Sequence, residues 1–244
     1  MSNFAFVFPG QGSQKIGMLA ELADQNPIIE KTFSEASEVL GYDMWQLIQQ
    51  GAQEDINLTQ RTQPILLTCS VAIWRLWNQK QGAKPSQMAG HSLGEWSALV
   101  CANVIDFADG LKMVEARGKF MQQAVPVGQG AMAAIIGLDD KAILAACTEA
   151  STLGVVDAVN FNAPGQVVIA GANDAVERAM DICKAAGAKR ALPLPVSAPF
   201  HTSLMKPAAD NLAEMVNTIT FRAPEVPVMH NVHAKNEHDP QAIK

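Results

Sequence analysis

The sequence predicts an α/β fold in which a largely parallel sheet carries an inserted subdomain of the order βαββαβ. An unbroken apolar run at residues 4–8 is typical of a central parallel strand that is covered on both faces. Strand and helix patterns then alternate along the chain, as they do in α/β domains. With 48% hydrophobic residues in a chain of 244, there is enough apolar material for a sizeable core.

The elements of the core are expected at both ends of the chain. The strand at 4–8 ends in a glycine-containing loop, and a helix is predicted with Asn26 as its N-cap and Pro27 at its first position. That helix ends at Gly41, where glycine favours a C-cap. The remaining core elements are a helix over 64–81, a strand at 87–89, helices from about 95 and from about 106, a helix over 207–219 and a strand near 226–231.

The middle of the chain has a different rhythm. Short strands are predicted at 131–136, 155–161, 166–170 and 190–196, with helices at 139–150 and 174–186. This is the ferredoxin-like order of elements. We therefore predict a discontinuous core of residues 1–127 and 198–244 and a ferredoxin-like subdomain of residues 128–197.

Composition excludes several classes of protein. A net charge of −6 and a pI near 5.3 argue against a nucleic-acid-binding protein. Four widely spaced cysteines without a C-x-x-C pair predict free, buried thiols rather than a zinc site or a disulfide framework. No signal peptide or apolar run of membrane-spanning length is recognisable. We expect a cytoplasmic monomer without metal or cofactor and without membrane contact.

The segment Gly90-His91-Ser92-Leu93-Gly94 has the G-x-S-x-G pattern of a nucleophile elbow. A strand is predicted before it and a helix after it, which is the context that the motif requires. The turn would expose the Ser92 hydroxyl at a helix N-terminus, where backbone N–H groups favour developing negative charge. The elbow predicts an α/β-hydrolase-like core with Ser92 as nucleophile. A plain N-cap serine is the alternative.

A serine nucleophile needs a base within hydrogen-bond reach. His91 adjoins the serine and would point away from it, whereas His230, His233 and His238 are expected to be solvated or in loops. His201 follows a predicted strand, in a proline-containing loop that could aim it at the elbow. By elimination His201 is the candidate base, with a structural role as the alternative.

Two further features could contribute to a site. Arg117 shares an apolar helix face with Leu111, Val114 and Met121, so it must reach solvent, pair with a carboxylate or bind an anionic ligand. Gly10-Gln11-Gly12 follows the first strand, at the sheet edge where α/β ligands bind, and could supply an oxyanion hole or be a simple turn.

Five segments together resemble the malonyl-CoA:acyl carrier protein transacylases of fatty acid synthesis. They are residues 8–14 (FPGQGSQ), 90–95 (GHSLGE), 115–117 (EAR), 162–166 (NAPGQ) and 199–201 (PFH). The resemblance spans nearly the whole chain. Family members continue for several tens of residues beyond the position of Lys244, so we expect a C-terminally truncated chain.

The resemblance implies a ping-pong transfer through a malonyl ester on Ser92, with His201 as base and acyl carrier protein as acceptor. It also implies that the N–H groups of Gln11 and Leu93 bind the oxyanion and that Arg117 binds the malonyl carboxylate. Phe200 would oppose a branched substrate.

The carrier protein is acidic in this family, and Lys184, Lys189 and Arg190 are candidates for its docking surface. Two other functions remain open. One is an α/β-hydrolase-type esterase or thioesterase, with Asp157 as a candidate acid, although no HGGG-type loop is present. The other is a non-catalytic module that binds carrier protein.

Overall fold

The computed structural model describes residues 3–126, 128–196 and 198–244, which form two compact units. Unit 1 comprises the described residues up to Lys119 together with Leu212–Lys244, and unit 2 comprises Phe120–Asn211. Residues 127 and 197, at the predicted subdomain boundaries, lie outside the described residues. The predicted domain division therefore stays a prediction. The α/β class of the fold is confirmed.

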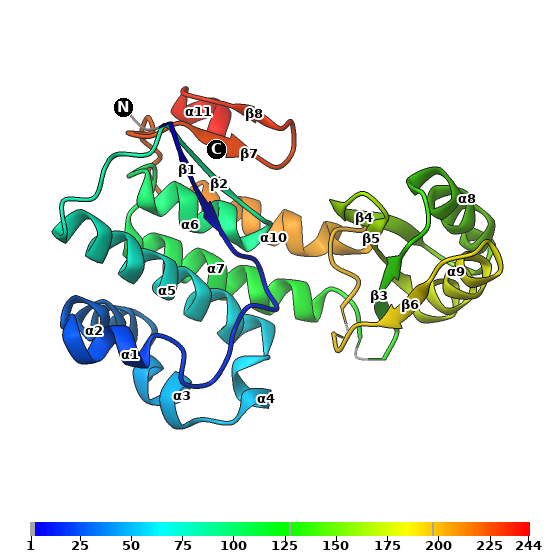
Figure 1. Cartoon of the computed structure of the whole chain (residues 1–244), viewed down its shortest axis with the longest axis horizontal. Helices are drawn as coiled ribbons and strands as arrows, with labels where there is room; N and C mark the ends of the chain where they lie inside the picture. The colour runs from blue at the N-terminus through cyan, green and yellow to red at the C-terminus, as the bar shows by residue number, and fades with distance from the viewer. Residues whose placement is uncertain (1–2, 127, 197) are drawn as a thin grey trace. The chain divides into compact units, whose positions relative to one another are not determined.

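Unit 1 contains a four-stranded mixed sheet. Its strands, in spatial order, are β1 (Ala5–Phe8), β2 (Gln87–Gly90), β7 (Val228–His230) and β8 (Lys235–Asn236). β2 pairs in parallel with both β1 and β7, and β8 is antiparallel to β7 (Figure 1). The carboxyl ends of β1 and β2 therefore lie at one edge of the sheet, so the loops after them are neighbours.

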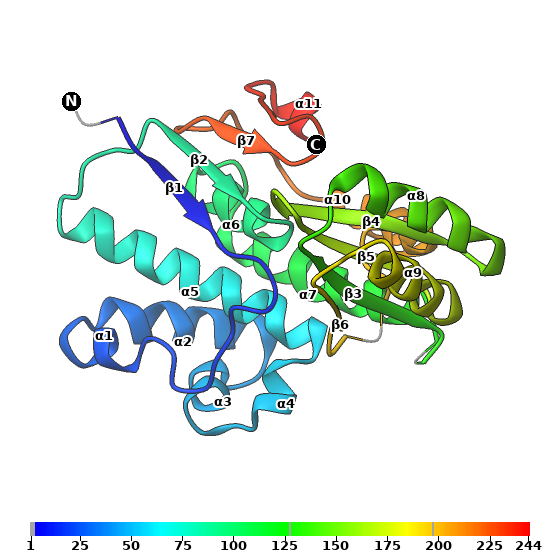
Figure 2. The same cartoon turned by 45° about the vertical axis from the view of Figure 1, so that its right-hand side comes forward.

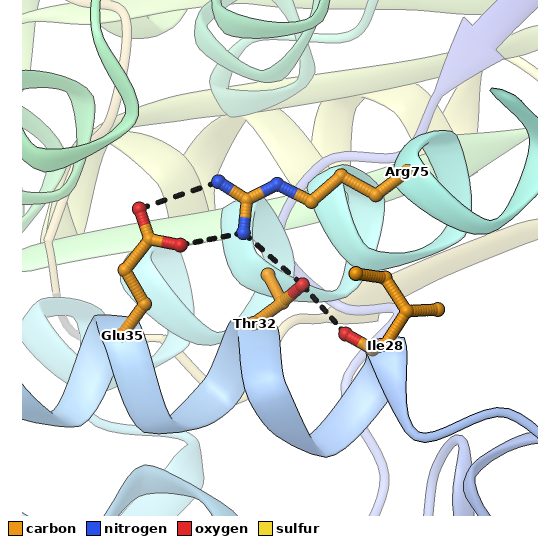
Figure 3. A network of polar contacts seen from close by, with 4 residues as sticks. All are labelled: Ile28, Thr32, Glu35 and Arg75. Atoms are coloured by element: carbon orange, nitrogen blue, oxygen red, sulfur yellow. Dashed lines mark hydrogen bonds and ion pairs between the residues drawn. The ribbon is translucent and has the colours of Figure 1, made fainter. Parts of the chain in front are cut away.

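Helices supply most of the core of unit 1. They are α1 (Ala20–Gln25), α2 (Ile28–Leu40), α3 (Met44–Gln50), α4 (Gln53–Ile56), α5 (Thr59–Gln79), α6 (Leu93–Cys101), α7 (Phe107–Gln123, which enters unit 2) and α11 (Pro240–Ile243). α2 is fixed to α5 by Arg75, whose guanidinium donates to Glu35 at 2.6 Å and to the Thr32 hydroxyl at 3.2 Å (Figure 3). Thr32 in turn donates to Ile28 O.

Two predicted helix starts in unit 1 are wrong. α2 begins at Ile28 and follows Pro27, because Asn26 instead ends α1, with its backbone N–H on Ala23 O and its side chain on Leu22 O. α5 begins at Thr59 rather than at Pro64. The N–H groups of Arg61 and Thr62 both donate to Leu58 O, at 2.7 and 2.8 Å, so the first turn forms before the proline.

Unit 2 contains an antiparallel sheet of four strands. In spatial order they are β4 (Val156–Ala163), β5 (Gln166–Ala172), β3 (Gly130–Ile136) and β6 (Arg190–Pro193). Its helices are α8 (Asp140–Ala150), α9 (Asn173–Ala185) and α10 (Lys206–Val216, which enters unit 1), with short 3-10 turns at Ser151–Leu153 and Ser203–Met205. α8 and α9 pack against each other and against this sheet (Figure 2).

Both faces of the central strands of unit 2 are buried. Ala133 and Ile135 of β3 belong to the cluster with α8 and α9, whereas Met132 belongs to a second cluster that contains Val125 and Phe200. This alternation follows from the two-residue period of a strand. The cluster on the second face also contains Phe200 and Met205, which precede and follow His201 in the sequence.

The state of the cysteines agrees with the expectation from composition. All four cysteines are free and buried, and burial raises the pKa of the Cys69 and Cys147 thiols to about 12. Within the described ranges, no helix is both long enough and apolar enough to span a bilayer.

Candidate functional site

Ser92 lies in a sharp turn between β2 and α6. Its φ of 52° and ψ of −103° are unusual for a residue with a side chain. The glycines on either side make the turn possible: a Cβ on Gly90 would lie 1.9 Å from the carbonyl carbon of Gly94, and one on Gly94 would lie 2.2 Å from Phe8 O. The G-x-S-x-G pattern therefore corresponds to the strained strand-to-helix turn of a nucleophile elbow.

The loop after β1 packs directly on this elbow. A Cβ on Gly10 would lie 2.7 Å from His91 O, and the N–H of His91 donates to Phe8 O at 3.1 Å. The next residue, Gln11, is held by its side chain, which donates to Thr59 Oγ1 at 3.3 Å. Leu93 is the first residue of α6, so its N–H has no carbonyl partner one turn earlier in the helix. Both candidate oxyanion donors thus belong to segments that border the elbow.

Arg117, on α7, points at the hydroxyl of Ser92. Its Nη2 donates to Ser92 Oγ at 3.1 Å and its Nη1 donates to Gln63 Oε1 at 2.7 Å. Desolvation lowers the pKa of Arg117 to about 10, an effect that the carboxylate of Glu95 partly opposes. The guanidinium therefore stays charged at neutral pH, and the two partners to which it donates, an amide oxygen and a serine hydroxyl, are neutral.

Gln63 is a site residue that the sequence analysis missed. It is 1% exposed, on α5, and its amide oxygen is the acceptor that orients Arg117. Close helix packing brings the two together, since a Cβ on Gly118 would lie 2.6 Å from the Gln60 Cα. The available signal was a glutamine beside Pro64, directly before the apolar run of residues 65–67, because a buried amide needs a polar partner.

A second group of residues missed at this site is centred on Glu95, in the first turn of α6. Its Oε1 lies 2.8 Å from His230 Nδ1, and its Oε2 accepts from the Asn231 N–H at 2.9 Å. The expectation that His230 is solvated or in a loop is wrong: it is in β7 and 8% exposed. His233 and His238 are exposed, as expected.

The other predicted site residues lie in unit 2. His201 is exposed in a turn before α10, at φ 66°. Its neighbour Phe200 is 8% exposed and packs with Met132 and Val168. Since each unit is described by itself, the pairing of His201 with Ser92 and the role of Phe200 in selectivity stay predictions.

The charged candidates of unit 2 are at its surface. Lys184 on α9 pairs with Asp181 at 3.4 Å, and Lys189 and Arg190 are exposed. Asp157, the candidate acid of a hydrolase, is exposed on β4. Among the residues that the structure describes, no group of three or more His, Cys, Asp or Glu side chains could hold a metal ion.

Known proteins resemble this chain over its whole length. The model of the family described as acyl transferase domain matches residues 5–243. The malonyl CoA-acyl carrier protein transacylase of Escherichia coli K12 is 65% identical over 244 residues, which is 100% of this chain and 79% of that protein. The protein of the same name from Bacillus subtilis is 47% identical over 235 residues, 96% of this chain and 74% of that protein.

Solved structures of similarly named proteins have the same fold as this chain. A crystal structure of an acyl carrier protein S-malonyltransferase from Vibrio cholerae has a TM-score of 0.97 at 62% identity, covering 99% of this chain and 79% of that one. A malonyl-transacylase in complex with its type II PKS acyl-carrier protein has a TM-score of 0.98 at 62% identity, covering 99% and 78%.

Proposed function

The chain belongs to the acyl transferase domain family, and we propose that it transfers malonyl from malonyl-CoA to the phosphopantetheine thiol of acyl carrier protein. The observation that carries this proposal is the 3.1 Å hydrogen bond from Arg117 Nη2 to Ser92 Oγ. A fixed cation beside a nucleophile suits an acyl donor that carries a carboxylate near its reacting carbonyl, as malonyl does and acetyl does not. The names of the similar proteins support the same substrate and acceptor.

The proposed reaction has two half-reactions with one ester intermediate. Ser92 Oγ attacks the thioester carbonyl while His201 removes the hydroxyl proton, and the resulting oxyanion is bound by the N–H groups of Gln11 and Leu93. The C–S bond then breaks, and coenzyme A leaves as a thiol with the proton from His201. In the second half-reaction the carrier thiol loses its proton to His201 and attacks the malonyl ester. The C–O bond to Ser92 then breaks, and Ser92 Oγ takes the proton back from His201.

Selectivity follows from the same arrangement. The malonyl carboxylate would accept from the guanidinium on the side of Nη2, which faces Ser92, while Gln63 holds Nη1 in place. An acetyl group would leave a partly desolvated cation without its anion, which is costly. Phe200 would add a steric limit against branched acyl groups.

We also propose how the chain is divided into a core and an inserted subdomain. We assign residues 1–127 and 198–244 to an α/β-hydrolase-like core and residues 128–197 to a ferredoxin-like subdomain. The elbow between β2 and α6 and the element order β3-α8-β4-β5-α9-β6 support this. Lys184, Lys189 and Arg190 are proposed to contact the acidic carrier protein, and free cysteines favour a cytoplasmic location.

The decisive experiment measures the mass of the intact chain after incubation with malonyl-CoA or acetyl-CoA. We expect a malonyl adduct on the wild type that greatly exceeds the acetyl adduct, and none on Ser92→Ala. Addition of carrier protein should discharge the adduct onto the carrier. Net hydrolysis of malonyl-CoA without acceptor would instead support a thioesterase, and carrier binding without any adduct would support a non-catalytic module.

A further inference from the structure

The backbone of Ser92 is held by the side chain of Asn231, the residue that follows β7. Ser92 makes no side-chain cap hydrogen bond to α6 that could stabilise its own turn. Instead, its N–H donates to Oδ1 of Asn231 at 3.0 Å. The other end of the same amide donates from Nδ2 to Gly90 O at 2.7 Å. One planar group thus binds the last residue of β2 and the residue before α6, spanning the turn of the elbow.

Asn231 is itself fixed to the helix that follows the serine. Its N–H donates to Glu95 Oε2 at 2.9 Å, while Glu95 Oε1 lies 2.8 Å from His230 Nδ1. These contacts tie the end of β7 to the first turn of α6, in addition to the parallel pairing of β7 with β2. The amide of Asn231 is therefore aimed at the elbow by two anchored neighbours, Glu95 and His230.

We propose that Asn231 is a positioning residue that fixes the peptide planes of Ser92 for acylation. By accepting a hydrogen bond from the Ser92 N–H, the Asn231 side chain holds the backbone of Ser92 at φ 52° and ψ −103°. These angles set the directions of Ser92 Oγ and of the Leu93 N–H. The two consecutive N–H groups then have separate tasks: that of Ser92 holds the turn, and that of Leu93 faces the oxyanion. The last assignment rests on the proposed function.

An asparagine is specifically suited to this position. The contact to Ser92 requires an acceptor and the contact to Gly90 O requires a donor, and a primary amide offers both in one plane. Aspartate has nearly the same shape but would place a second oxygen against the Gly90 carbonyl. Alanine would remove both contacts. The pair of variants separates the loss of the amide from the loss of side-chain volume.

The structure also provides a matched control on the same hairpin. Asn236, on β8, accepts from Gln87 Nε2 at 2.9 Å, so it also ties the β7–β8 hairpin to β2, by a hydrogen bond between two side chains. Its hydrogen bond is made three residues before Gly90 and does not involve the turn. If the asparagines only attach the hairpin to β2, substitution of either one should have a similar effect. If Asn231 positions Ser92, only its substitution should change the reaction of Ser92.

The test compares wild type, Asn231→Ala, Asn231→Asp and Asn236→Ala. Intact mass gives the rate and the final extent of Ser92 modification, first by a fluorophosphonate and then by malonyl-CoA. We expect Asn231→Ala to slow both reactions about 10- to 100-fold, because a small misplacement of a reacting group has effects of this size. The final extent should stay at one adduct per chain, kcat should fall with KM little changed, and Asn236→Ala should match the wild type.

Asn231→Asp should react at least as slowly as Asn231→Ala and is the second readout if the alanine variant does not fold. Rates for Asn231→Ala within twofold of Asn236→Ala would overturn the inference. So would a lower final extent of modification with an unchanged rate, which would mean that fewer chains fold. A wild type that reacts with the fluorophosphonate but not with malonyl-CoA would refute the proposed function, and the phosphonylation rates alone would then decide the role of Asn231.

Discussion

Ser92 in unit 1 and His201 in unit 2 are both held at a positive φ, of 52° and 66°, but by different means. The turn of Ser92 depends on backbone approach across two glycines and on an amide 139 positions away in sequence. The turn of His201 depends on its immediate neighbours. Phe200 and Thr202 are buried on either side of it, and the Thr202 hydroxyl donates to Pro199 O at 2.8 Å.

The difference concerns how strain is supported. A residue in a sparsely populated backbone region costs about 1–3 kcal/mol and persists only where its surroundings fix it. At Ser92 the support is long-range, so it exists only once the sheet of unit 1 has formed. At His201 the hydrogen bonds that support the turn are local and join residues within a few positions of it, while Phe200 adds apolar packing against Met132 and Val168. Substitutions that remove the support of the elbow should therefore have larger effects than substitutions that remove the support of the His201 turn.

The largest expected effect is that of Gly90→Ala. Its Cβ would lie 1.9 Å from the carbonyl carbon of Gly94 and 2.0 Å from its oxygen, and backbone cannot move aside as a side chain can. We expect the rate of malonyl-Ser92 formation to fall by more than about a hundredfold. Intact mass over time measures this rate, and thermal unfolding measures the accompanying loss of stability.

Gly187→Ala is the matched control for this substitution. Gly187 has a φ of 101°, yet its Cβ would meet nothing within 4 Å. This variant therefore imposes backbone strain without a close contact, and it should acylate at the wild-type rate. A Gly90→Ala chain that reacts as fast as Gly187→Ala would mean that the elbow tolerates the displacement and does not depend on the close backbone approach at Gly90.

The sequence could predict the parts of the fold that have a local cause. The α/β class, the strand at 4–8 and the elements of the middle region follow from apolar periodicity, and the observed bounds differ from the predicted ones mostly at element ends. The starts of α2 and α5 differ from the prediction, which places Pro27 and Pro64 at the first helical positions. In each case a neighbouring hydrogen bond, at Asn26 or at Leu58, decides where the helix begins.

In the site, too, the sequence predicts only the residues whose signal is local. Ser92 could be found from its motif, and Arg117 from its place in an apolar stripe, because both signals are contained within a few turns of chain. The sequence does not identify three other residues of the site, because each depends on a partner that is distant along the chain. Gln63 contacts a residue 54 positions away, Glu95 one 135 positions away and Asn231 one 136 positions away. A buried amide or carboxylate signals that a partner exists, without saying which one.

The next largest effect is expected for His201→Ala. Loss of a general base typically reduces a rate by about 10²–10⁴-fold. Because His201 is exposed and its turn is supported by its neighbours, thermal stability should change little. Single-turnover acylation by malonyl-CoA gives the rate. His233→Ala removes another exposed histidine and should react as the wild type does. A His201→Ala chain with wild-type acylation would exclude this residue as the base.

Arg117→Ala should have a smaller effect that depends on the substrate. Loss of a charged hydrogen-bond partner for the malonyl carboxylate corresponds to about a 10- to 150-fold loss of malonyl transfer. Acetyl transfer should change much less, because acetyl has no carboxylate. The ratio of the two kcat/KM values is the measurement. Equal losses for both substrates would mean that Arg117 supports Ser92 through their 3.1 Å contact instead of binding the substrate.

The smallest effect is expected for Thr202→Val, which tests the local support of His201. Valine keeps the shape of a buried side chain but removes a hydroxyl that donates to Pro199 O and accepts from the Leu204 N–H. Leaving these groups unpaired should cost about 1–3 kcal/mol of unfolding free energy. Thr148→Val, which removes an exposed hydroxyl that donates to Leu144 O, is the control and should cost almost nothing. Acylation should slow only a fewfold, because Phe200 still anchors the turn by apolar packing. If Thr202→Val instead lowers the acylation rate as much as His201→Ala, the turn of His201 depends on one hydrogen-bonding side chain, as we propose for the elbow and Asn231.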